Sequence, residues 1–182
     1  SRSEKSLKEL REISERTRKR LEDKLDRHEK ESKKVEDKAR EVLKELEDLV
    51  RTLEEVARRG DISEEMIDRE LKKLRERVKE IKDDLKRLND ELRERSKRVN
   101  DRLKEENEKL KRKIDEVERE GIDEEVRRRL RELLERHKRI SDEARKRNED
   151  LLREHEKRSR DIEKRLDDLL KEAEDRLRER KR

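Results

Sequence analysis

Histidine has the widest chemical range of any residue type in this 182-residue chain, and only three are present, at His28, His137 and His155. An imidazole can bind a metal ion, exchange a proton near neutral pH or form hydrogen bonds through both ring nitrogens. The chain has no Cys, and no histidine belongs to a His-x-x-x-His or Glu-x-x-His motif of the kind that binds metals on helices. On one helix, His137 and His155 would lie about 27 Å apart, because each residue advances the helix by ~1.5 Å. We therefore expect no metal ion and no other cofactor.

The composition of the rest of the chain is typical of either a disordered polyampholyte or long helices. Asp, Glu, Lys and Arg make up 64% of the residues, and there is no Pro, Phe, Tyr or Trp. Ordinary globular chains are only ~25% charged. The distribution of the apolar residues decides between the two, because Gly60 and Gly121 divide the chain into three parts that hold 15 apolar residues each. Nothing in the interior of a part would break a helix.

Apolar residues in each part recur at steps of three and four, which predicts one apolar stripe along a helix. A representative run is Leu71, Leu74, Val78, Ile81 and Leu85. The stripes leave few apolar residues for a second interface, so we expect a monomer. A homo-oligomer and a helix-swapped dimer are the alternatives, since long bundles with short hinges exchange helices easily.

The two breaks have the residues that end and begin helices. Gly60 and Gly121 can adopt the left-handed conformation that ends a helix, and Ser63 and Asp123 are expected to cap the helices that follow. Such short connections force neighbouring helices to run antiparallel. The sequence therefore predicts an all-α fold, an up-down-up three-helix bundle in which residues 1–182 form one domain. The expected helices cover about 3–59, 64–120 and 124–180.

Histidine and uncharged polar residues interrupt the stripes within one band, less than half a helix in length. Aligning the antiparallel helices places one histidine in each of three layers. A buried polar group without a partner costs ~1–3 kcal/mol, whereas a complete network fixes the register of the helices. Asn89, Asn100 and Ser141 lie one step off the stripes, so their burial stays open. The expected layers are His137 with Ser14, Thr17 and Asn107; His28 with Ser96 and Asn148; and His155 with Ser32, Asn89 and Ser159.

Several functional classes are disfavoured by the sequence. No Asp or Glu falls on a predicted stripe, so we expect no acid to orient an imidazole beside Ser14 or Ser32, and no catalytic residues. The 61 basic and 56 acidic residues are interspersed, and there are no aromatic residues on which bases could stack. No apolar run approaches the ~18 residues that cross a membrane. We therefore expect no enzyme activity, no nucleic-acid partner and no membrane partner.

Taken together, the three equal parts, the short loops, the charged coat and the polar band resemble de novo designed helical bundles. The resemblance is to the parametric coiled-coil type with buried hydrogen-bond networks. It implies a synthetic protein with no natural substrate, required partner or compartment, soluble in the cytoplasm of an expression host.

The function expected from these features is that of a structural scaffold. The alternative is a designed conditional switch or binding module, which would respond to acid through its buried histidines or exchange a partner helix at the polar band. A third hypothesis, a natural spectrin-like spacer, has less support, because such repeats carry aromatic core residues and this chain has none.

Overall fold

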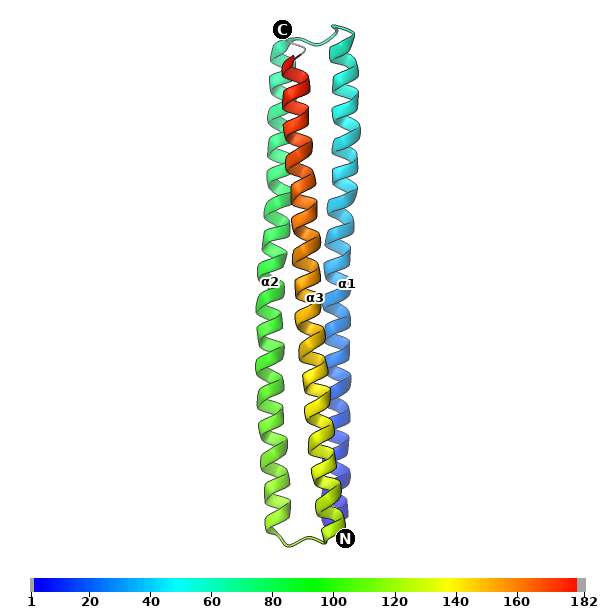
Figure 1. The fold of residues 1–182 in the computed structure, drawn as a ribbon, viewed down its shortest axis with the longest axis vertical. Helices are drawn as coiled ribbons and strands as arrows, with labels where there is room; N and C mark the ends of the chain where they lie inside the picture. Colours follow the sequence, from blue (N-terminus) through cyan, green and yellow to red (C-terminus); the bar gives the residue numbers. More distant parts are fainter. Residues whose placement is uncertain (1, 180–182) are drawn as a thin grey trace. The chain divides into compact units, whose positions relative to one another are not determined.

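The computed structural model describes residues 2–179 of the chain, which form three α-helices (Figure 1). These are α1 (Arg2–Arg58), α2 (Glu64–Arg119) and α3 (Glu124–Glu179), and the described residues contain no strand. Helix α1 begins and ends one residue before the expected range 3–59. Helices α2 and α3 begin where expected, and α2 ends one residue early. The expected end of the third helix, at residue 180, lies outside the described residues.

Both connections follow the chemistry of helix ends. Gly60 and Gly121 have φ angles of 72° and 77°, in the left-handed region that favours glycine. The N–H of Gly60 donates to the carbonyl of Ala57, which closes the last turn of α1. At the start of α2, the Ser63 hydroxyl accepts a hydrogen bond from the backbone N–H of Met66 at 3.2 Å. This is the geometry of a serine N-cap.

The described helices pack as two compact units, and each helix contributes one segment to each unit. The first unit contains residues 2–29 and 92–152, and the second contains residues 30–91 and 153–179. The loop at Gly121 reverses the chain within the first unit, and the loop at Gly60 reverses it within the second. Each unit is therefore an antiparallel three-helix bundle.

The apolar cores of the two units differ. The second unit has one large cluster of buried residues, which includes Leu46, Leu85 and Leu166. The first unit has two smaller clusters, one around Leu130 and one around Leu103. On each helix of the first unit, polar residues stand between the members of these two clusters. Burying a leucine contributes ~1.5–3 kcal/mol to stability, so the apolar clusters stabilise the fold. The polar residues interrupt the apolar core between these clusters.

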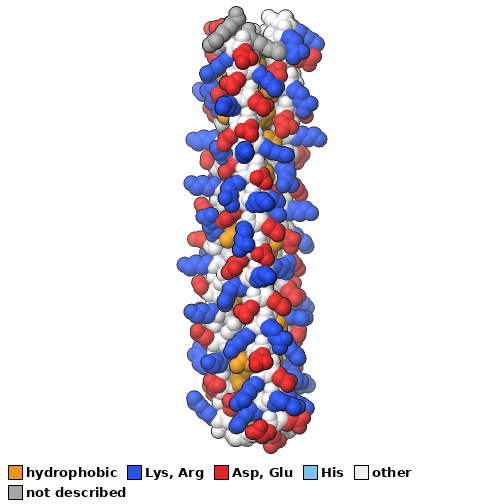
Figure 2. Space-filling view, viewed as in Figure 1, with side chains coloured by type: hydrophobic (Ala, Val, Ile, Leu, Met, Phe, Trp, Pro, Cys, Tyr) orange, Lys and Arg blue, Asp and Glu red, His pale blue; other side chains and the backbone are white. Residues whose placement is uncertain are grey.

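The surface is densely charged. Figure 2 shows Lys and Arg side chains interspersed with Asp and Glu over the visible face, with only small apolar areas between them. Among the described residues, the exposed large apolar side chains are Leu49 and Met66. None of the described helices is long and apolar enough to cross a membrane.

Candidate functional site

The three histidines differ in burial. His137 is 2% exposed and His155 is fully buried, whereas His28 is half-buried. The expectation of a buried His28 is therefore wrong. The buried positions around it on α1, Leu25 and Ser32, are seven residues apart, and the position between them turns partly toward solvent.

In the first unit, His137 joins a network that reaches all three helices. The Ser14 hydroxyl of α1 lies 2.9 Å from Nδ1 of His137 on α3. One turn along α3, the Ser141 hydroxyl donates to Oδ1 of Asn107 on α2, at 2.9 Å, and lies 3.0 Å from the backbone carbonyl of His137. Thr17 is buried near this network. The structure thus brings Ser14, Asn107 and His137 together and adds Ser141, whose burial the sequence had left open.

The second ring nitrogen of His137 differs from the first in its hydrogen bonding. Its Nε2 is buried and has no hydrogen-bond partner among the described residues. Burial lowers the pKa of His137 below its ordinary value, and the nearby carboxylate of Glu106 offsets this only in part. The imidazole is therefore favoured in its neutral form and carries the desolvation cost of one unsatisfied nitrogen.

In the second unit, His155 lies in a more complete network. Its Nδ1 is 2.7 Å from Oε1 of Glu36 and also within hydrogen-bond distance of the Ser32 hydroxyl. Ser32 itself donates to Glu36 Oε1 at 3.1 Å, and the Ser159 hydroxyl lies 3.3 Å from Nε2 of His155. An ionised carboxylate only accepts hydrogen bonds. The arrangement is satisfied when Nδ1–H and Ser32 both donate to Glu36 and Ser159 donates to Nε2.

Glu36 is a member of this network that was not predicted from the sequence. It is 3% exposed, and Arg158 donates to its Oε2 at 2.7 Å. Burial is the largest influence on the Glu36 carboxyl and acts to raise its pKa. The hydrogen bonds from His155 and Arg158 outweigh burial, so the pKa lies below its ordinary value. The expectation that no acid lies beside an imidazole is therefore wrong.

A second carboxylate, Glu54, is also buried in this unit, and Arg176 donates to it at 3.2 Å. The alignment of the helices predicts an arginine partner for each of the two acids. The alignment that places Ser32 beside His155 also places Glu36 beside Arg158, and the same offset along α1 and α3 pairs Glu54 with Arg176.

In the layer expected around His28, the hydrogen bonds of Asn148 join α3 to α2. Asn148 is 3% exposed, and its Nδ2 donates to the backbone carbonyl of Ser96 at 3.1 Å and to Oδ1 of Asn100 at 3.4 Å. Asn89, expected beside His155, is half-buried, and its Oδ1 has no hydrogen-bond partner among the described residues. It therefore does not complete the His155 network through that oxygen.

The hydroxyl, imidazole and carboxylate of Ser32, His155 and Glu36 do not have the geometry of a catalytic triad. In a triad, the nucleophile and the acid bond to opposite nitrogens of the imidazole. Here both face Nδ1, and the three side chains are at most 5% exposed, which leaves no room for a substrate. The described residues include no group of three or more His, Cys, Asp or Glu side chains placed to hold a metal ion. The arrangement of Ser32, Glu36 and His155 is instead suited to holding α1 and α3 together by hydrogen bonds.

Comparison with known proteins bears on the fold. No protein-family model and no curated protein matches the chain. Among solved structures, it is similar to one described as a "Computationally designed three helix bundle", with a TM-score of 0.51 and 18% sequence identity. The match covers 98% of this chain and 85% of that one. The fold is a three-helix bundle. The resemblance to designed helical bundles is thereby confirmed for the fold.

Proposed function

We propose that this protein is a designed structural scaffold without a natural biochemical activity, in which buried hydrogen-bond networks specify how the helices align. One observation carries the proposal: the buried side chains of Ser32, Glu36 and His155, with Arg158 and Ser159, satisfy one another between α1 and α3. The likeness to a computationally designed bundle supports the synthetic origin. Such a protein requires no partner and has no natural compartment.

The networks specify alignment because apolar contacts alone do not. Leucine layers fit one another after a slip of one helical turn, ~5.4 Å, nearly as well as before it. The same slip would separate Glu36 from His155 and Arg158 and leave a buried carboxylate unpaired. Removing one partner of a buried charged pair typically costs ~3–5 kcal/mol. The Glu36 network therefore selects against the slipped arrangement.

Replacing the network with apolar residues tests this proposal. In the triple variant Ser32→Ala, Glu36→Leu and His155→Leu, we expect unchanged or higher stability but more than one helix alignment. Because the chain has no native Cys, spin labels can be attached to cysteines introduced at the exposed positions Lys38 and Arg160. The parent should give one distance by electron paramagnetic resonance and the triple variant several. A single unchanged distance in the triple variant would contradict the proposal.

We also propose that the two units unfold together as one domain and that the protein is a monomer. The dense, mixed-sign charge on the surface supports the monomer, because it leaves only Leu49 and Met66 as exposed large apolar side chains among the described residues. Size-exclusion chromatography with light scattering should give the monomer mass of 22.6 kDa. A dimer mass would overturn this part of the proposal and favour helix exchange.

A second candidate function, an acid-responsive switch, is favoured by one specific observation. The buried imidazole of His137 has one nitrogen without a partner, so protonating it in place is costly. The groups around it are Glu106, Lys109 and Lys113 on α2 and Arg16 and Arg20 on α1, so the cations outnumber the single carboxylate. In this reading, acid loosens the first unit before the second. Light scattering and helical circular dichroism from pH 7.5 to 4.5 test the switch, and unchanged mass and helicity would exclude it.

A further inference from the structure

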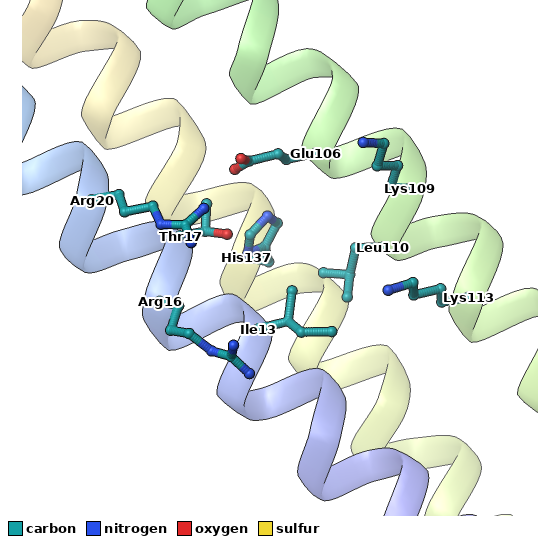
Figure 3. A pocket seen from close by; sticks show the side chains of 9 residues that line it. All are labelled: Ile13, Arg16, Thr17, Arg20, Glu106, Lys109, Leu110, Lys113 and His137. Carbon is teal, nitrogen blue, oxygen red and sulfur yellow. The ribbon is translucent and has the colours of Figure 1, made fainter.

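The first unit contains a partly open cavity of about 230 Å³ beside His137. It is lined by apolar Ile13 and Leu110, by Thr17, and by the long side chains of charged residues from α1 and α2. Figure 3 shows the imidazole of His137 among these side chains, with the Glu106 carboxylate on one side of the ring. All of the lining residues belong to the first unit.

The unpaired nitrogen of His137 is an independent observation that points to a ligand at this cavity. His137 is 2% exposed, Nδ1 is engaged by Ser14, and Nε2 has no partner. The equivalent nitrogen of His155 is close to the Ser159 hydroxyl. A buried polar atom that is left unpaired beside a cavity gains free energy from any ligand that can hydrogen-bond to it.

The charge around the cavity favours an anion. Arg16, Arg20, Lys109 and Lys113 contribute four positive charges, against the single carboxylate of Glu106. Long cationic side chains can cover apolar surface with their aliphatic segments while their charged ends remain in water. The cavity therefore combines apolar walls, one buried hydrogen-bonding nitrogen and a positively charged rim.

The size of the cavity narrows the class of ligand. Pockets for drug-sized molecules are usually ~300–1,000 Å³, and an engineered apolar cavity of about 150 Å³ holds benzene. A cavity of about 230 Å³ lies between these two cases. We propose that it binds a small aromatic carboxylate, with the ring against Ile13 and Leu110 and the carboxylate accepting a hydrogen bond from His137 Nε2–H within the cationic rim. Neither a scaffold nor an acid switch requires such a site.

Benzoate is the probe, and imidazole ¹⁵N NMR is the readout, because the chain has only three histidines. We expect saturable shifts of the His137 ring nitrogens and no change at His155. Binding an anion favours the protonated imidazole, so the pKa of His137 should rise in the presence of benzoate. Benzyl alcohol, which has a similar size and no charge, should bind more weakly. Linear shifts, equal shifts at both histidines, or equal affinity for benzyl alcohol would overturn the proposal.

A pair of double variants separates the site from general attraction to a basic helix. Lys109→Gln with Lys113→Gln removes two charges of the rim, and we expect benzoate to bind roughly fivefold more weakly. Lys104→Gln with Lys111→Gln is the matched control, because these exposed residues of α2 do not line the cavity. The control should bind benzoate as the parent does. Equal weakening in both double variants would overturn the site.

A filling variant tests the location without changing the charge. Ile13→Phe places a ring where the benzoate ring is expected, and Ile13 is only half-buried, so the variant should fold. Circular dichroism verifies the helical content. We expect the histidine shifts caused by benzoate to disappear, and full retention of binding would place the ligand elsewhere and overturn the proposal.

Discussion

At the scale of single residues, Glu36 is a buried side chain whose local sequence gives little indication of its burial. It occurs among charged residues, and its sequence neighbours do not distinguish it from the exposed acids of α1. Its burial depends on Arg158 and His155, which are 122 and 119 residues away in the sequence. By contrast, the pairs Ser14–His137 and Ser32–His155 were predictable, because hydroxyls and imidazoles are rare in this chain and their alignment is regular.

Replacing the Glu36 carboxylate by the amide of nearly the same shape should be destabilising. Glu36→Gln removes the charge that accepts from Arg158 and His155, and hydrogen bonds to charged groups contribute ~1.5–3 kcal/mol. We expect a loss of about 2 kcal/mol in the free energy of unfolding at pH 7, measured by urea denaturation. Glu41→Gln on the exposed side of α1 is the control and should change little. Equal effects from the two variants would show that Glu36 is not specially paired.

Glu36 and His137 should produce acid sensitivity in different pH ranges. The pKa of Glu36 is lowered in the folded state, so its stabilisation is present above the unfolded value of about 4.3 and is lost as the pH falls below it. The pKa of His137 is lowered from an unfolded value of about 6.5. The unfolded state therefore takes up the proton first, and stability falls as the pH drops below about 6.5.

Removing the imidazole of His137 should weaken the pH dependence of stability in the upper of these two pH ranges. Between pH 7.5 and 5, the parent should lose stability at up to ~1.4 kcal/mol per pH unit, and His137→Asn should lose much less. Urea midpoints at several pH values provide the measurement. His28→Asn serves as a comparison in which an imidazole is removed from a half-buried position. If His137→Asn and the parent respond equally to pH, the buried neutral imidazole is not the cause.

At the scale of helices, the sequence predicted nearly everything, because the signals are local. Steps of three and four define each stripe, and glycine and serine mark the breaks between the helices. The positive φ angles at Gly60 and Gly121 and the Ser63 cap follow from those residue types alone. What local signals could not provide is the orientation of a position such as His28, because that depends on how the neighbouring helices pack against it.

The turn glycines provide a test at this scale. A Cβ added at Gly60 would meet no atom within 4 Å, so the cost of Gly60→Ala comes from the left-handed backbone alone. We expect a loss of about 1 kcal/mol, and a smaller loss for Gly60→Asn, because asparagine tolerates this conformation better. Thermal unfolding followed by circular dichroism compares the two. An alanine variant as stable as the parent would show that the turn does not require the left-handed conformation.

At the scale of the whole molecule, both units depend on the same three helices. Each helix runs from one unit into the other, so melting a segment in one unit leaves a frayed helix end in the other. We expect one cooperative transition in urea at pH 7.5, with the same midpoint by circular dichroism and by histidine NMR. Two separate midpoints would show that residues 1–182 unfold as two domains.

Buried side chains of different helices satisfy one another, and we propose that they thereby set the alignment of the helices. The tautomer of His155 provides the test, because the network requires the proton on Nδ1, facing Glu36. Imidazole ¹⁵N NMR at pH 7.5 should show His155 held in the Nδ1–H tautomer, with a slowly exchanging proton that Glu36→Gln disturbs and Glu41→Gln does not. A His155 ring with rapidly exchanging protons and averaged tautomers, unaffected by Glu36→Gln, would show that the buried network does not hold His155 in place.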